Sequence, residues 1–272
     1  MPDYRLVITG IFFGFALLEG LRGVLFVREK TKPKDLILEL AAGIAIPVLI
    51  VPFALYAAPV LIESVAPGYK DSLSSWPAWL MFLGLLIGDD LTQYWWHRLS
   101  HTWPWLYSFH RAHHSAEYMS VRIVYRNSLL YYALMPGVWI SSGLVFLGFG
   151  PVYVWYAIAK LSIIMGAHSS VPWDQPLIRN RYTRPLIWLL ARIVSTPTTH
   201  AAHHGKYRSD PATHYKGNFG NFLFFWDVLF GTAKITEERP QEFGLEKVSS
   251  ASWFQELLWP VGMNTSEYEQ TD

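Results

Sequence analysis

The sequence predicts an all-α integral membrane protein, a bundle of about four to five transmembrane helices with a cytoplasmic helical cap that carries a histidine-rich dinuclear metal site. Three observations predict this fold class. The 272 residues are 51% hydrophobic and 16% charged, whereas soluble domains carry about a quarter charged residues. About five apolar stretches approach or reach the roughly 20 residues with which a helix spans a bilayer. The ten histidines are concentrated in short motifs, as a metal site requires.

The apolar stretches are the predicted transmembrane helices, and they lie at residues 4–27, 36–62, 76–97, 127–148 and 151–168. Glu19 and Arg22 interrupt the first, and their spacing of three would let them pair on one helix face. Lys160 in the last is expected to snorkel or to pair with an acid such as Glu19. Because Gly148 and Pro151 separate the fourth stretch from the fifth, these two are expected to form a tight hairpin.

Lysine and arginine in the loops predict the orientation of the bundle. Arg28, Lys30, Lys32 and Lys34 follow the first stretch, and the positive-inside rule places them in the cytoplasm. Alternation along the predicted spans then puts the loop 63–75 outside and brings all ten histidines to the cytoplasmic face. The sequence therefore predicts a multi-pass protein with its histidine cluster on one side.

The remainder of the chain, after residue 170, contains no predicted span. Segments 177–194 and 253–261 mix tryptophan with aliphatic residues, so we expect them to lie at the membrane interface. The last ten residues are polar and are expected to be disordered. No linker divides the chain, and residues 1–272 are therefore predicted to form a single membrane domain.

Composition excludes several function classes. The net charge of +1 provides no broad basic surface, which argues against nucleic acid as a partner. The chain has no cysteine, so disulfides, thiolate catalysis, zinc–thiolate sites and iron–sulfur clusters are excluded.

Histidine motifs carry the functional prediction. Eight of the ten histidines fall in three words, which are His97-x-x-x-His101, His110-x-x-His113-His114 and His200-x-x-His203-His204. On a helix, residues three and four apart are neighbours about 5–6 Å apart at Cβ, so each word can aim several imidazoles at one point. A mononuclear site with two histidines and a carboxylate would not need so many. Two metal ions with four or five imidazoles each would use them.

Other function classes stay open on this pattern. Two metals with a bound hydroxide could hydrolyse a lipid ester or phosphate, although such sites normally include carboxylates and these words contain none. A haem electron carrier would need one imidazole on each face of the haem, which leaves the adjacent histidine pairs unused. A metal transporter should hold its ligands at mid-membrane.

The histidine words lie within longer motifs, namely Asp90-x-x-x-Tyr94-Trp95-Trp96-His97-Arg98-Leu99-Ser100-His101, His110-Arg111-x-His113-His114, Gly166-Ala167-His168-Ser169, His200-x-x-His203-His204, Asn218-Phe219-Gly220-Asn221 and Trp226-Asp227-x-x-Phe230-Gly231-Thr232. In this order and spacing the chain resembles the membrane fatty acid hydroxylase/sterol desaturase superfamily. The resemblance covers about residues 80–235. It predicts a catalytic region at 76–235, preceded by an N-terminal transmembrane hairpin at 4–75 and followed by a C-terminal tail at 236–272.

The resemblance implies the cofactors, partners and ligands. It implies a helical membrane bundle whose cytoplasmic cap holds two irons, for which zinc can substitute in a preparation. It implies O₂-dependent hydroxylation or desaturation of an unactivated C–H bond in a lipid such as a sterol or fatty acyl chain. A separate donor of the ferredoxin, cytochrome b5 or reductase type would supply electrons. The catalytic, metal-binding set would be His97, His110, His113, His200 and His203 on one metal and His101, His114, His168 and His204 on the other.

Several neighbouring residues are expected to support the ligands without binding metal. Asp90 lies seven residues before His97 and could accept an N–H of a ligand histidine, or it could be a helix-end acid in interfacial water. Tyr94 could line the pocket, although an aromatic residue here is more often part of the packing or of the interface belt. Asn218 and Asp227 are expected to shape turns, and Asn218 could also reach the second shell. Two positions fit no ligand word: His214, expected to be a surface or second-shell histidine, and Ile164, where some members of the superfamily carry a further histidine.

Overall fold

The computed structural model describes residues 4–27, 29–247 and 251–260. In these ranges the regular structure is helical, and no β-sheet forms beyond two isolated bridges, so the predicted all-α class is confirmed. In chain order the helices are α1 (Tyr4–Leu21), α2 (Pro33–Ala45), η1 (Ile46–Ile50), α3 (Val51–Val65), α4 (Ala78–Leu85), η2 (Leu86–Leu91), α5 (Thr92–Ser100), α6 (Pro104–His114), η3 (Val121–Tyr125), α7 (Leu129–Ala133), α8 (Pro136–Leu144), η4 (Val145–Phe149), α9 (Gly150–His168), α10 (Gln175–Arg179), α11 (Arg184–Leu190), α12 (Pro197–His203), α13 (Phe225–Phe230) and α14 (Trp253–Leu258).

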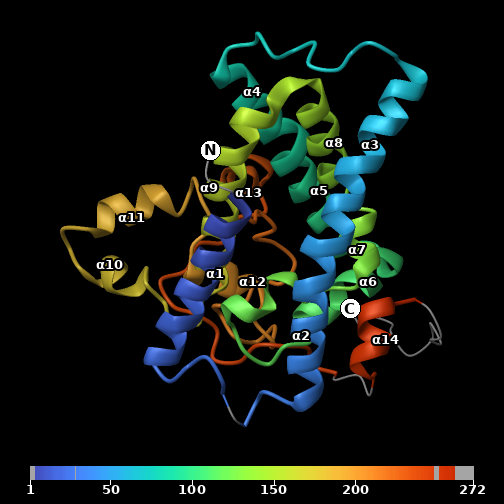
Figure 1. Cartoon of the computed structure of the whole chain (residues 1–272). Helices are drawn as coiled ribbons and strands as arrows, with labels where there is room; N and C mark the ends of the chain where they lie inside the picture. Colours follow the sequence, from blue (N-terminus) through green and yellow to red (C-terminus); the bar gives the residue numbers. More distant parts are fainter. Residues whose placement is uncertain (1–3, 28, 248–250, 261–272) are drawn as a thin grey trace.

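Three helical runs of the described residues are long and apolar enough to cross a membrane. They are α1, the 33-residue run Pro33–Val65 formed by α2, η1 and α3, and the 33-residue run Pro136–His168 formed by α8, η4 and α9. The last run bends at Gly148, so that α8 and α9 descend from the bend as two helices (Figure 1). Gly148 has φ +115°, and a Cβ there would lie 2.8 Å from the Ser74 backbone. The predicted break near Gly148 is therefore found.

Two predicted spans differ from the observed helices. Helices α4, η2 and α5 run without a break over residues 78–100, near the stretch predicted at 76–97, but this run is not among the three apolar ones. Its π-helical part contains Asp89 and Asp90, and polar residues of α5 follow. The stretch predicted at 127–148 is not one helix, because α7 ends before Pro136 begins α8. The expectation of four to five spans stays a prediction.

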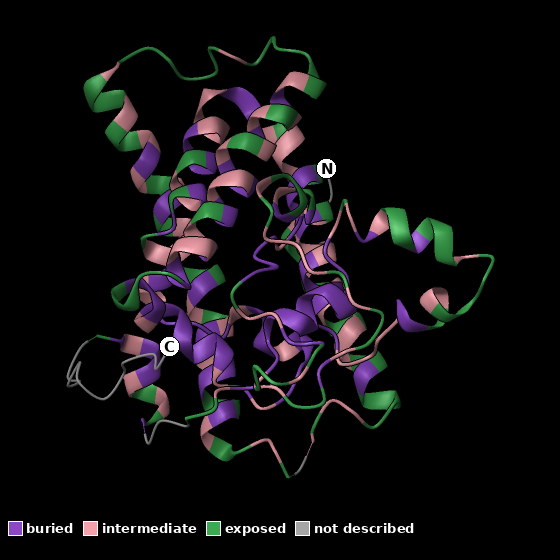
Figure 2. Ribbon diagram, turned by 180° about the vertical axis from the view of Figure 1, so that it is seen from behind, coloured by how far each residue is buried: buried purple, intermediate pink, exposed green. Residues whose placement is uncertain are grey.

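Buried and exposed residues divide the molecule into two parts. Buried positions gather around the middle and lower part, where α6 and α12 lie, whereas the upper helices carry many exposed positions (Figure 2). On α1 and α3, large apolar side chains such as Phe13, Phe53 and Val65 are exposed. Helix α1 packs on α9, and α3 packs on α8. Exposed apolar faces on helices of spanning length are what contact with lipid requires.

The segments after α9 surround the lower part of the body. Helices α10 and α11 project from it (Figure 1), and Leu186, Trp188 and Leu189 are exposed there, consistent with the interfacial character predicted for 177–194. Helix α14 packs on the body, because its Leu257 is buried against α2 and Trp259 beyond it is buried beside Phe109, whereas Phe254 is exposed; its interfacial location stays a prediction. The ten terminal residues expected to be disordered lie outside the described residues.

Glu19 and Lys160 have other partners than those predicted from the sequence. Glu19, at the end of α1, does not pair with the exposed Arg22. It is fully buried and accepts hydrogen bonds from the loops after α6 and α9, with donors Ser120 Oγ (2.6 Å), Val121 N (3.0 Å), Ser169 Oγ (3.1 Å) and Ser170 N (3.0 Å). Lys160 pairs with Asp89 at 2.7 Å instead of Glu19. The reason is the position of Lys160 along α9. Eight residues, or about 12 Å, separate it from the end of the helix, which lies near Glu19.

Candidate metal centre

Nine histidines converge from four helices at the centre of the molecule. Helix α5 and its C-cap supply the first word, α6 the second, and α12 and its C-cap the third, while α9 ends on His168. None of the nine is more than 5% exposed. Every histidine predicted as a ligand is thus brought to one buried site.

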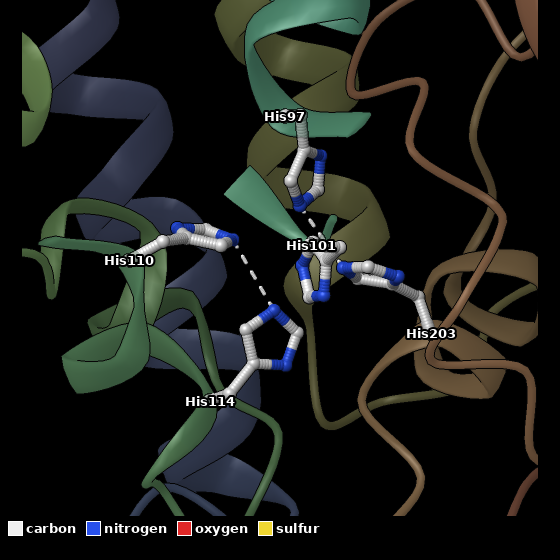
Figure 3. A group of neighbouring side chains, drawn as sticks. All are labelled: His97, His101, His110, His114 and His203. Carbon is white, nitrogen blue, oxygen red and sulfur yellow. Dashed lines mark hydrogen bonds between the residues drawn. The ribbon is translucent and has the colours of Figure 1, made fainter. Parts of the chain in front are cut away.

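The histidines form two groups. Within each group one ring nitrogen per residue lies within 4.8 Å of all the others. The first group, drawn in Figure 3, is His97, His101, His110, His114 and His203. The second group is His113, His168, His200 and His204.

This division differs from the one that the resemblance implied, and helix geometry explains the difference. At 3.6 residues per turn, positions i and i+4 are about 40° apart around a helix, whereas i+3 and i+4 are about 100° apart. The first and last histidines of each H-x-x-H-H word therefore share a group, as His110 with His114 and His200 with His204. The middle histidine crosses to the other group. Each word contributes to both groups.

Five of the rings are fixed by a hydrogen bond at Nδ1. The acceptors are Phe219 O for His97 (2.7 Å), Asn127 Oδ1 for His110 (2.8 Å), Ile123 O for His113 (3.1 Å), Ile164 O for His168 (2.7 Å) and Gly217 O for His203 (2.7 Å). A carbonyl oxygen can only accept, so Nδ1 carries the proton and the neutral ring presents the Nε2 lone pair.

These lone pairs face one another inside the groups. His203 Nε2 lies 3.0 Å from His97 Nε2, and His168 Nε2 lies 3.3 Å from His113 Nε2. Two acceptors at this separation repel unless a cation lies between them. Two nitrogens bound at right angles to one metal, each at about 2.1 Å, would be about 3.0 Å apart. The rings therefore fit a bound metal ion better than they fit one another.

Burial keeps the rings neutral. It lowers the pKa of His113, His200 and His204 well below the usual 6.5, and neighbouring histidines lower it further. His110, His114 and His203 behave alike. Neutral imidazole is the form that binds metal, so these six are competent ligands at neutral pH.

Backbone carbonyl groups of the segment 217–220 orient histidine rings on two helices, α5 and α12. The carbonyl groups of Gly217 and Phe219 accept from His203 and His97. Asn218, between them, has φ +57° and uses its side chain on the backbone, donating to Thr199 O and Lys234 O at 2.8 Å each. The predicted support from Asn218 is thus placed beside the ligands, and it acts through the peptide chain.

Asp227 forms hydrogen bonds with the same segment. Its carboxylate accepts from Phe219 N (2.8 Å), Gly220 N (2.6 Å) and Thr232 Oγ1 (2.6 Å), and burial raises its pKa. A Cβ on Gly220 would lie 2.8 Å from that carboxylate and 2.5 Å from Leu223 O. The expected turn-shaping role of Asp227 therefore has a specific form, because its bond to Gly220 N fixes the peptide plane that also contains the Phe219 carbonyl group, the acceptor for His97.

Asp90 and Tyr94 contact α13 and the residues that flank it. Asp90 accepts from Trp226 Nε1 at 2.8 Å and Leu223 N at 3.3 Å, and not from a histidine, because α13 and the turn before it fill the space beside η2. The buried Tyr94 hydroxyl lies 2.9 Å from Thr232 Oγ1, and its ring stacks on Phe230. Both side chains fix α13 against the helix that carries His97.

His214 and Ile164 complete the predicted set. His214 belongs to neither group; its Nε2 lies 3.2 Å from Thr232 O, and its backbone N–H donates to Ala202 O at 2.6 Å. This position agrees with the prediction that His214 is not a ligand. Ile164 brings no imidazole, but its carbonyl oxygen orients His168.

Sequence reasoning missed several residues that support the ligands. Asn127 binds His110, and Glu19 joins the loops that follow α6 and α9. Arg126 is 1% exposed, donates to Ala112 O at 2.7 Å and pairs with Asp35 at 2.9 Å. A single asparagine or arginine makes no pattern along the chain. Among these residues, only Glu19 stands out in the sequence, because it is a charged residue within an apolar stretch.

Comparison with known proteins finds one family model and several relatives that match this chain. The family model "Fatty acid hydroxylase" matches residues 82–232. Alkylglycerol monooxygenase of Danio rerio is 29% identical over 160 residues, 58% of this chain and 31% of that protein. The human alkylglycerol monooxygenase is 29% identical over 167 residues, 61% of this chain and 32% of that protein. The ornithine lipid hydroxylase OlsE of Rhizobium tropici is 31% identical over 164 residues, 58% of this chain and 43% of that protein.

The aligned region limits what these relatives imply. The match to the alkylglycerol monooxygenases spans about a third of their length. No solved structure matches the chain significantly. The matched region includes all nine histidines of the two groups and the segment that orients them. Because the family model covers more than half of the chain, the protein belongs to the fatty acid hydroxylase family.

Proposed function

We propose that this protein is an O₂-dependent membrane oxidoreductase that hydroxylates or desaturates an unactivated C–H bond of a lipid. The observation that carries the proposal is the pair of adjacent, buried, all-imidazole groups whose Nε2 atoms face each other. Both groups would hold iron, which would supply the activation of O₂. The family match and the lipid-oxidising relatives support this reaction class.

The residues of this chain orient the histidine rings and shield the site from water. Five rings are held at Nδ1, so their Nε2 atoms cannot rotate away, and less reorganisation is needed when metal binds. Burial of all nine rings excludes water, which protects a reactive site from side reactions. The described groups contain no carboxylate, and this composition favours oxidation over the hydrolysis that carboxylate-rich dinuclear sites perform.

The surroundings of the site support a lipid substrate. Exposed apolar faces on the spanning helices would let a lipid reach the centre from the bilayer. A separate reductase, ferredoxin or cytochrome would deliver electrons. The basic residues after α1 would place the histidine groups on the cytoplasmic side.

A comparison of lipid extracts tests the reaction. Cells that express the protein should contain a lipid that gains one oxygen or loses two hydrogens, as measured by mass spectrometry. Cells that express His203→Ala should lack it, because that ring joins the first group, whereas His214→Ala should retain at least about half of the product, since His214 is not a ligand. Product formation by His203→Ala would contradict the proposal. Bound zinc with lipid hydrolysis and no O₂ uptake would favour the hydrolase instead.

A further inference from the structure

An ion pair inside the helical bundle lies outside the histidine groups. Lys160 Nζ of α9 donates to Asp89 Oδ2 of η2 at 2.7 Å, and each of the two side chains is 10% exposed. Replacement of such a buried pair by apolar residues of similar volume is often neutral or stabilising, because both charges have lost their hydration. Ionisable side chains are rare within transmembrane segments and usually have a function there. Stability is therefore a weak explanation for this pair.

The two partners are equally far along the chain from a ligand histidine. Asp89 precedes His97 by eight residues, and Lys160 precedes His168 by eight residues. Both stretches are helical throughout, so each charged residue lies about 12 Å, or just over two helical turns, before its histidine. His97 belongs to the first histidine group and His168 to the second. The ion pair therefore joins, at matching positions, two helical runs that carry ligands of different groups.

The position of His168 depends directly on the position of α9. Its ring Nδ1 donates to Ile164 O, the carbonyl group one turn earlier in the same helix, at 2.7 Å. A displacement of α9 would therefore move His168 Nε2, which lies 3.3 Å from His113 Nε2. Helix α9 packs against α4, whereas η2 and α5 make few close backbone contacts with it. The pair of Asp89 and Lys160 is thus a direct link between α9 and the helical run of His97.

Neighbouring groups hold the carboxylate of Asp89 in place. A Cβ on Gly137 of α8 would lie 2.6 Å from Asp89 Oδ1, so α8 closes over the carboxylate. Asp90, the next residue, accepts from Trp226 Nε1 of α13 at 2.8 Å. Successive residues of a helix point in different directions, so the two aspartates bind two different elements. The π-helical turn η2, a type of turn often found at functional sites, therefore fixes the helical run of His97 against both α9 and α13.

We propose that Asp89 and Lys160 are positioning residues that set the separation between the two histidine groups. The pair fixes α9, and with it His168, relative to the helical run that carries His97. Each partner acts through its own helix, from just over two turns away. The proposal rests on the proposed function in one respect, because it takes both groups to bind metal. It does not depend on which lipid is oxidised.

A double substitution separates positioning from stability. Lys160→Met alone leaves the charge of Asp89 buried and unpaired, so the melting temperature of this variant should fall. Asp89→Asn combined with Lys160→Met removes both charges with little change in volume, and its melting temperature should return close to that of the wild type. Lys160→Arg keeps a cation opposite Asp89. Arg184→Gln breaks an exposed ion pair with Glu237 on α11 and serves as the control.

The separation can be measured without turnover. The iron-loaded full chain is placed in phosphatidylcholine nanodiscs, and the iron–iron scattering is recorded in its X-ray absorption spectrum. Wild type, Lys160→Arg and Arg184→Gln should give the same iron–iron signal. The double variant should bind two irons and show a changed or lost iron–iron signal, because α9 can then shift relative to α5. A chelator should remove one of its irons about tenfold more easily, since residues that orient ligands affect metal affinity by about this factor.

The outcomes separate this proposal from the proposed reaction. An iron–iron signal and a chelator resistance equal to those of the wild type in the double variant would overturn the positioning role and leave the proposed reaction intact. A signal in Lys160→Arg that changes as much as in the double variant would also contradict the role, because that variant keeps the cation. If the signal depends on the pair while the wild type oxidises no lipid, the proposed reaction fails and the positioning role stands.

Discussion

At the scale of single residues, the site depends on where each imidazole proton is held. Five Nδ1–H groups are committed to oxygen acceptors, and four of these acceptors are backbone carbonyl groups. Asp227 accepts from Gly220 N, which lies in the same peptide plane as the Phe219 carbonyl group, so it orders that carbonyl group without touching a histidine. We expect this buried carboxylate to influence metal affinity through the direction of that peptide plane.

Substitution of Asp227 tests this control. Asp227→Ala leaves two buried amide donors and the Thr232 hydroxyl without their acceptor, so metal affinity should fall about 10- to 100-fold. Asp227→Asn keeps an acceptor and should lose less. Titration with a chelator, followed by metal analysis, measures the change. The exposed Glu246→Gln serves as control. Equal metal retention by Asp227→Ala and the control would show that the Phe219 carbonyl group is ordered in another way.

At the scale of elements, the helix end that carries the first H-x-x-H-H word is held by the distant helix α14. Leu257 of α14 packs in a cluster with Leu38, Ala42, Ile46 and Ala112, and Ala112 lies between two ligands. Arg126 adds a polar connection, since it donates to Ala112 O and lies 3.6 Å from Glu256. The region predicted as a tail thus contributes to the packing of α6.

Two substitutions on α14 separate packing from surface effects. Leu257→Ala should destabilise the protein by about 2–4 kcal/mol, because it opens a cavity in a buried cluster. Phe254→Ala, on the exposed side of the same helix, should destabilise the protein much less than Leu257→Ala does. Thermal unfolding in detergent compares them. If the two variants melt at the same temperature, α14 does not stabilise α6 through Leu257.

At the scale of the whole molecule, the sequence predicted the members of the site better than their surroundings. The spacing of His110, His113 and His114 predicted that these residues share one buried site, because helix periodicity is local. The partners of these ligands are not local, since Asn127 is 17 residues from His110 and Glu19 is 101 residues from Ser120. The division into two groups could have been predicted from the angle between i and i+4.

The number of metal ions per chain tests the central claim most directly. We expect about two irons per chain in the purified wild-type protein, without a haem absorption band, because two groups of imidazoles lie side by side. His168→Ala should retain about one iron, since His168 lies only in the second group, and His214→Ala should retain both. One iron per chain in the wild type, or two in His168→Ala, would contradict a dinuclear centre divided as the structure indicates.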